Sequence, residues 1–215
     1  MGLELGGEIG QRVGQVVAAS GFGVEVAGGV ASVYTDGGTE AAWTNPSFAT
    51  DETLGNANAT LDADAAPPVL KSEWLRINSL GIEIPATATV RGIELQARCK
   101  HTDATETARI EMRLTTGTDK SDHLNLGTGS ETVTLSGTPF QEVSVGSSTE
   151  LWGRAWTPGQ INSLAFGLAA QMRIDGAGVS ATDVNRIAVL RVAVTYTLPT
   201  AQQGGNRSRD RGRGR

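Results

Sequence analysis

Residues 90–99, VRGIELQARC, alternate apolar and polar side chains with a period of two, and residues 108–115, ARIEMRLT, repeat that alternation. Each stretch therefore has one apolar face and one charged face, as expected for antiparallel strands that cover a core on one side and meet water on the other. A later stretch, residues 187–196, carries a similar apolar pattern. The residues predicted to face a common core are Ile93, Leu95, Ile110, Met112, Val192 and Val194.

Further strand patterns cover residues 132–135, 141–145 and 164–174, with turn-rich loops between them. No helical pattern alternates with the strands, so a parallel α/β fold is excluded. One short helix is predicted in WTPGQINS, where Thr157 suits the cap, Pro158 the first helical position and Gln160 the capping box. We predict an all-β fold, an antiparallel two-sheet jelly-roll-like sandwich with one short helix and extended N- and C-terminal arms.

Glycine divides the chain into a body and two arms, because 11 of its 28 glycines lie in the first 42 residues, where they raise the entropic cost of ordering. We predict a glycine-rich N-terminal arm at 1–42, a β-sandwich domain at 43–198 and an Arg/Gly-rich tail at 199–215. Residues 45–68 are polar and are predicted to form a surface excursion. Short strands that a partner orders are predicted in the N-terminal arm, with the apolar contact residues Phe22, Val24 and Val26.

Charge is distributed unevenly along the chain. Residues 207–215 carry five arginines against Asp210, a local charge of +4. Because the net charge of the whole chain is −5, the remaining residues carry −9. An extended tail would place its arginines on one side, facing either an acidic subunit surface or nucleic acid. We favour the protein surface, and if nucleic acid binds at all it is expected to do so only through this tail, since the acidic body repels phosphate. The predicted contact residues of the tail are Arg207, Arg209, Arg211, Arg213 and Arg215.

Candidates for catalysis and for metal binding are few, so we predict that the chain is not an enzyme and has no cofactor or metal. Cys99 is expected to be a small buried or edge thiol, and His101 and His123 solvated loop residues. The aspartates of 62–64 and 119–122 do not follow EF-hand spacing, and no glycine string has the nucleotide-binding arrangement. No apolar run reaches the roughly 18 residues that span a bilayer, so we expect a soluble protein made in a reducing cytoplasm.

Four tryptophans allow two interpretations. They could form an exposed carbohydrate platform, or they could fill the core or a subunit contact, which we favour because aromatic residues make up only 5% of the chain. Trp152 and Trp156 share strand parity and are predicted to lie at a partner contact. The other two are Trp43 and Trp74.

Three segments together resemble a β-sandwich module of virion structural proteins in tailed bacteriophages and prophages. An apolar strand ends at Ile84-Pro85, and a strand beginning at Gly92-Ile93 follows it. An LWG…W…IN…FG segment then precedes a final V.V.Y strand, and the resemblance spans roughly residues 43–197. The positions that carry this later part are Leu151, Trp152, Gly153, Trp156, Ile161, Asn162, Phe166, Gly167, Val192, Val194 and Tyr196.

The resemblance implies a structural protein of the virion, with a role in head decoration or cementing, or as a head-tail, neck or tail accessory component. It implies partners among other copies of the chain and other virion proteins, as a homo-oligomer, with no membrane. The location would be the virion, after synthesis in the cytoplasm of the host bacterium. A carbohydrate-binding host-recognition module of a fibre is the alternative function.

Overall fold

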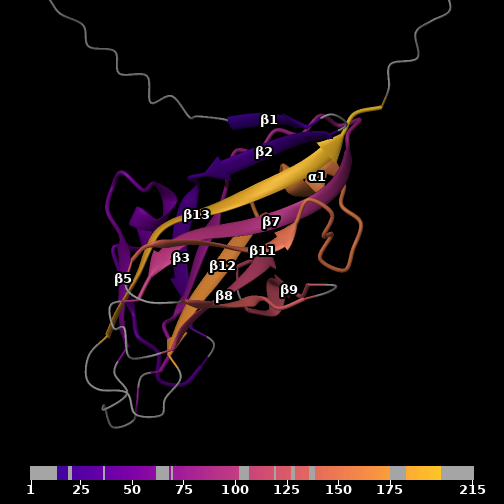
Figure 1. The fold of residues 1–215 in the computed structure, drawn as a ribbon. Helices are drawn as coiled ribbons and strands as arrows, with labels where there is room; N and C mark the ends of the chain where they lie inside the picture. Colours follow the sequence, from indigo (N-terminus) through magenta and orange to yellow (C-terminus); the bar gives the residue numbers. More distant parts are fainter. Residues whose placement is uncertain are drawn as a thin grey trace, which may run out of the picture.

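The computed structural model describes residues 14–18, 21–35, 37–61, 68, 70–101, 107–118, 120–126, 129–135, 139–174 and 183–199. These residues form two sheets packed face to face (Figure 1). The first sheet contains β1 Gly14–Ala18, β2 Gly21–Ala27, β4 Trp43–Thr44, β5 Ala57–Leu61, β7 Thr89–Lys100, β11 Gln141–Ser147 and β13 Asp183–Thr197. The second contains β3 Val30–Tyr34, β6 Trp74–Asn78, β8 Ala108–Thr115, β9 His123–Leu124, β10 Thr132–Leu135 and β12 Gly167–Ile174.

We name these layers the β13 sheet and the β12 sheet after their central strands. In the β13 sheet the order β5-β13-β7-β11 is fully antiparallel, and in the β12 sheet the order β6-β12-β8-β10 is as well. The chain crosses between the sheets at nearly every step, and only β8 and β10 are successive members of one sheet within these eight strands. This is the connectivity of a jelly roll, so the predicted fold class is confirmed.

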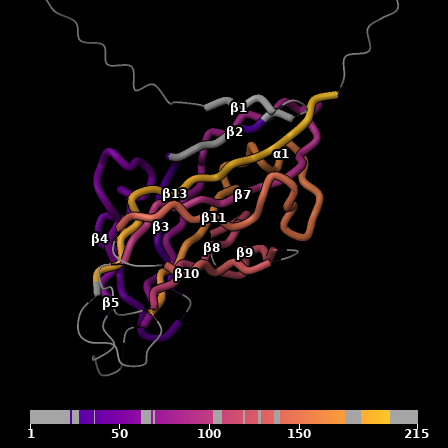
Figure 2. Tube along the Cα trace, in the orientation of Figure 1, coloured from indigo at the N-terminus to yellow at the C-terminus, as the bar shows by residue number. Residues whose placement is uncertain are grey.

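The core lies between the two sheets and follows the predicted alternation. All six residues predicted to face it are fully buried, at 0% exposure, and belong to one hydrophobic cluster. The polar residues of these strands point to the opposite faces, where Arg98 pairs with Glu142 and Glu111 pairs with Arg113. Figure 2 shows β13, β7 and β11 side by side in the same order as the hydrogen-bonded register.

The predicted helix is present as α1 Pro158–Ile161. The Thr157 hydroxyl accepts from the Gln160 amide at 3.3 Å, and the Gln160 side chain accepts from the Thr157 amide at 3.0 Å. The first backbone N–H groups of a helix have no acceptor within the helix, and this reciprocal capping box supplies acceptors for two of them. The remaining helical turns among the described residues are the 3-10 segments η1 Pro46–Thr50 and η2 Lys120–Asp122.

The predicted boundary at residue 43 does not coincide with a boundary in the structure. Strand β2 pairs with β13, from Phe22 opposite Tyr196 to Ala27 opposite Arg191, and β3 pairs with β6 along its whole length. Strands of the predicted N-terminal arm are therefore members of both sheets in the single chain. Its first 13 residues lie outside the described part, as do residues 200–215 of the predicted tail.

The surface excursion predicted for residues 45–68 is wrong for residues 57–61 and for Ala49, while residues 62–67 lie outside the described part. Strand β5 pairs with the first residues of β13, and it buries Ala57, Ala59 and Leu61 in the core. The turn η1 buries Ala49 in the same cluster. The small side chains of this segment gave a weak apolar signal, yet they fit because the core is close to the backbone there.

Gly146 in β11 permits a close contact between β11 and β7. Its φ is +88°, and a Cβ at this position would lie 2.4 Å from the Ile93 carbonyl oxygen. We predict that Gly146→Ala lowers the free energy of unfolding by about 1–3 kcal/mol, because the substitution is strained and the contact must open. Urea denaturation of the purified variant measures the change.

Gly159→Ala is the matched control. Gly159 lies in α1, and a Cβ there has no heavy atom within 4 Å. Its stability should stay unchanged or rise by up to about 1 kcal/mol, since alanine favours a helix over glycine. Equal stability of the two variants would show that β11 does not need the left-handed glycine.

Candidate functional site

All four tryptophans are buried, with exposed fractions of 2% to 7%. The Trp152 indole nitrogen donates to the Ile93 carbonyl at 3.0 Å, and that of Trp156 donates to the Leu151 carbonyl at 2.9 Å. Trp156 also packs edge-on against Phe166, with ring centroids 5.5 Å apart. These two rings are core residues of the single chain, so the prediction that they form a partner contact is wrong.

The reason is that residues 151–157 are a turn rather than a strand, so strand parity does not apply to them. Trp152 has φ +56° and is followed by Gly153 with φ +72°. This left-handed pair turns the chain back and places the Trp152 ring beneath β7 and β11, next to Gly146. The LWG motif was the sequence signal for such a turn, since glycine readily adopts positive φ.

The other predicted partner residues are placed only in part. Phe22, Val24 and Val26 lie in β2, opposite Tyr196, Val194 and Val192 of β13, so their backbone is occupied by a strand pairing within the chain. The arginines of the tail, from Arg207 to Arg215, lie outside the described residues. Their contact roles stay predictions.

The histidines are not the solvated loop residues that the sequence predicted. His101 is 1% exposed, and its Nδ1 lies 3.2 Å from Oδ1 of the buried Asn185. His123 is half-buried, hydrogen-bonded to the Tyr34 hydroxyl and packed edge-on against Trp74 with centroids 4.5 Å apart. Both environments come from strands distant in sequence, so no local pattern revealed them.

The thiol of Cys99 is fully buried, as predicted. Burial raises its pKa to about 12, with a smaller contribution from the negative charge of Glu142. Near neutral pH this thiol stays protonated and is a poor nucleophile or metal ligand.

Within the described ranges, no group of three or more His, Cys, Asp or Glu side chains is placed to hold a metal ion. The candidate aspartates of residues 62–64, together with Asp119, lie outside those ranges. Asp122 accepts a 2.6 Å hydrogen bond from the Thr118 amide and closes a tight loop. Among the same residues, no helix is long and apolar enough to cross a membrane.

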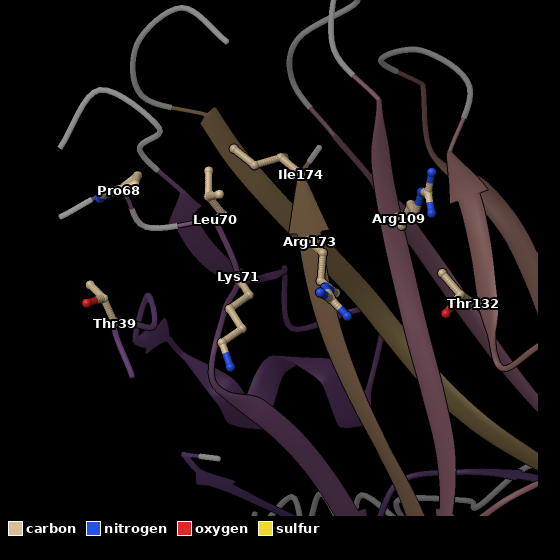
Figure 3. Close-up of a pocket in the computed structure, with 8 residues that line it drawn as sticks. All are labelled: Thr39, Pro68, Leu70, Lys71, Arg109, Thr132, Arg173 and Ile174. Atoms are coloured by element: carbon tan, nitrogen blue, oxygen red, sulfur yellow. The ribbon is translucent and has the colours of Figure 1, made fainter. Parts of the chain in front are cut away.

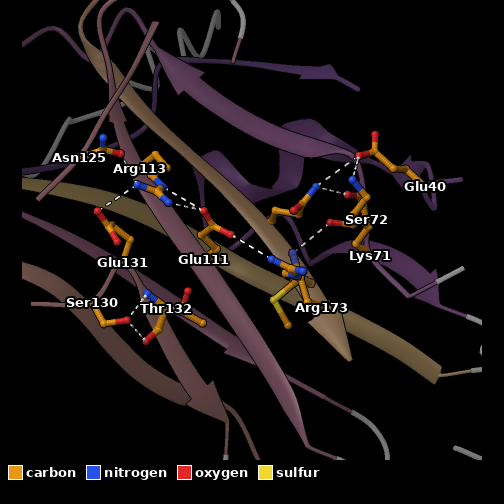
Figure 4. A network of polar contacts seen from close by, with 12 residues as sticks. Glu40, Lys71, Ser72, Glu111, Arg113, Asn125, Ser130, Glu131, Thr132 and Arg173 are labelled. Atoms are coloured by element: carbon orange, nitrogen blue, oxygen red, sulfur yellow. Dashed lines mark hydrogen bonds and ion pairs between the residues drawn. The ribbon is translucent and has the colours of Figure 1, made fainter. Parts of the chain in front are cut away.

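A network of ion pairs covers the outer face of the β12 sheet (Figure 4). Arg113 contacts Glu131 at 2.9 Å and Glu111 at 2.8 Å, and the second oxygen of Glu111 lies 3.5 Å from Arg173. Lys71 pairs at 3.0 Å with Glu40, whose side chain is only 1% exposed. The partly buried pairs of this network are screened less by salt than exposed ones.

The network ends at a cavity of about 510 Å³ (Figure 3). Three cationic side chains, Lys71, Arg173 and Arg109, lie on successive backbone segments across it. Two threonines and a short apolar wall complete the lining, formed by Thr39, Thr132, Pro68, Leu70 and Ile174. A cavity of this size with several positive groups suits an anionic ligand.

The outer face of the β13 sheet has a different, balanced charge pattern. Arg98 and Arg191 each contact both Glu52 and Glu142, at distances from 3.2 to 3.7 Å. Two cations therefore share two carboxylates. This cluster lies over β7 and β13 and is partly open to solvent, which limits what each pair adds to stability.

An apolar corner of the β12 sheet is exposed. Strand β3 ends the sheet in the described part of the chain, and its Val30 and Val33 are 58% and 41% exposed. Asn78 pairs with Val30 and donates to the carbonyl of Leu164, which is 72% exposed. Exposed apolar residues on an edge strand are typical of a surface that another chain covers.

Comparisons with known proteins do not assign the chain to a family. No protein-family model and no curated protein matches the chain. Among solved structures, it is similar to a chain described as the cyanophage Pam1 capsid asymmetric unit, at 17% sequence identity. The match covers 89% of this chain and 95% of that one, with a TM-score of 0.24. A TM-score this low does not establish a shared fold.

The environment of His123 predicts a pH-dependent stability. Burial, with a smaller contribution from the positive charge of Arg113, lowers its pKa from 6.5 to about 4. Between these pH values the unfolded chain binds more protons than the folded chain. The contribution of His123 to the free energy of unfolding is therefore fully present above about pH 6.5 and is lost as the pH drops towards 4. Urea denaturation across this range should show that loss.

His123→Asn isolates the contribution of this residue, because His101 and all carboxylates remain. The variant should be less stable than the wild type near pH 7 and should lose less stability between pH 6.5 and 4. Identical pH slopes for the two proteins would assign the acid sensitivity to other groups.

Proposed function

We propose that this chain is a virion structural protein of a tailed bacteriophage that assembles on the particle through its arms. Its role would be head decoration or cementing, or that of a head-tail, neck or tail accessory protein. The proposal includes a homo-oligomer that contacts other virion proteins, located in the virion after synthesis in the host cytoplasm. It also includes the absence of an enzymatic activity.

One observation carries this proposal, the burial of all four tryptophans in a chain that folds as a jelly roll. Jelly rolls are common in viral capsid proteins and in lectins, an association at the level of the fold alone. A carbohydrate platform needs exposed aromatic rings, whereas here Trp43, Trp152 and Trp156 belong to the core and donate to backbone carbonyls of their own chain. Trp74 is buried as well, packed edge-on against His123. The rival role as a glycan-binding fibre module therefore lacks its main requirement.

The positions of the described residues nearest the two ends of the chain support assembly. Phe22 of β2 lies opposite Tyr196, near the end of β13, so strand β1 and the last described residues lie at the same end of the molecule (Figure 1). Segments that leave the same end of the molecule are able to reach the same neighbouring subunit. Segments that order on binding cover a large surface for their length.

The reactive side chains also favour a structural role over catalysis. Cys99 and His101 are buried, while His123 lies on the outer face of the other sheet, against Trp74. They do not converge on a common cavity in the described part of the chain. Catalysis by a nucleophile and a base requires such convergence.

Electron microscopy of purified particles from the phage or prophage that encodes the sequence tests the proposal. We expect density for the two-sheet sandwich at a repeated position on the particle, with additional density from residues 1–13 or 200–215 against a neighbour. Absence of the protein from intact particles, checked by mass spectrometry of the same sample, would refute a virion role.

Truncation after Gly205 tests the tail. The sandwich should keep its thermal unfolding temperature, while incorporation into particles falls, because the removed segment carries five arginines. High salt should weaken incorporation of the full chain in the same way by screening. Incorporation that is normal and insensitive to salt after truncation would leave the tail without a role in assembly.

A further inference from the structure

Three cations occupy one row across the outer face of the β12 sheet. Arg173 of β12 lies directly opposite Arg109 of β8, and Lys71 bridges to Arg173 from the other side. Residues opposite each other on antiparallel strands project from the same face, within about 5.5 Å at Cβ. Like charges at this spacing repel one another, and Lys71 is compensated by Glu40 at 3.0 Å.

The centre of this row is weakly compensated. The Arg173 side chain is 52% exposed, and its one carboxylate contact among the described residues is Glu111 at 3.5 Å. The other oxygen of Glu111 accepts from Arg113 at 2.8 and 2.9 Å, so most of its charge is already engaged. Arg173 therefore offers donors to a ligand without losing a short contact.

The lining around the row selects the kind of anion. The hydroxyls of Thr39 and Thr132 add hydrogen-bond partners, and Leu70 and Ile174 form an apolar wall beside the cations. Oxyanions on short aliphatic stems, such as the side chains of aspartate and glutamate, match both features. The fork of a guanidinium also suits a carboxylate well.

We propose that this cavity binds the carboxylates of an acidic segment from a second copy of the chain. The charge of the chain supports this occupant, since its residues outside 207–215 carry −9 while this cavity presents three cations. An acidic protein repels nucleic acid at long range but attracts the cationic cavity of another copy. The inference rests on the proposed function, because it names the partner within the assembly.

Hexaglutamate is the probe for the site, and thermal unfolding of the full chain is the measurement. Peptide at about ten times its dissociation constant should raise the unfolding midpoint by about 3–6 °C, because it binds the folded sandwich. Arg173→Gln should weaken binding about ten-fold or more and reduce the rise to about 1–2 °C or less at the same peptide concentration. The tail is present in every variant, so its own attraction for the peptide is common to all.

Arg98→Gln is the matched control, because it removes the same charge from a side chain that is 42% exposed on the β13 sheet. It should keep the full response to hexaglutamate. An equal loss in Arg98→Gln and Arg173→Gln would mean unspecific attraction, and no loss in Arg173→Gln would overturn the site. Tighter binding of a DNA oligonucleotide through Arg173 would overturn the choice of a protein ligand.

Sedimentation velocity at low and high salt tests the second copy as the occupant. The wild type and Arg98→Gln should self-associate at low salt, and Arg173→Gln should do so markedly less. Unchanged self-association in Arg173→Gln, or a wild type that stays monomeric, would overturn this occupant. If the protein binds hexaglutamate but is absent from purified particles, the proposed function is refuted and the anion site is retained.

Discussion

The pairing of β13 with three other strands is the constraint on which the sandwich depends. Along one edge β13 pairs with β7 over almost its whole length, and along the other it pairs first with β5 and then with β2. Its inward residues Leu190, Val192 and Val194 are fully buried. Because a slip of one residue would turn this row to the opposite face, the register of β13 decides which residues of its neighbours reach the core.

Two bulges fit this long strand to a curved sheet. Between Ile187 and Val189 the register shifts by one residue, so Ile187 faces the core before the bulge and Leu190 faces it afterwards. The apolar run from Ile187 to Leu190 predicted a strand, but not this change of side. A bulge depends on how two strands fit together, and that information is absent from the pattern of either strand alone.

The sequence predicted the strands whose own side chains alternate, and missed those whose position depends on the neighbouring strand. The stretches 90–99 and 108–115 had clear alternation, and the capping box of α1 was complete within four residues. Strand β5 reads ANATL and has one large apolar residue, Leu61, so its place in the sheet follows from β13. The histidines were misjudged for the same reason, since Asn185, Tyr34 and Trp74 are remote in sequence.

The cationic row is a further product of register, since Lys71, Arg109 and Arg173 are far apart in the chain and meet only across strands. Its proposed ligand has a consequence for assembly. A cationic cavity on one copy and an acidic segment on another are different surfaces, so the contact is heterologous rather than a two-fold self-contact. Heterologous contacts close into rings when the rotation allows it and otherwise extend. Such a contact would give each subunit one donor and one acceptor side, the arrangement needed to repeat around a particle axis.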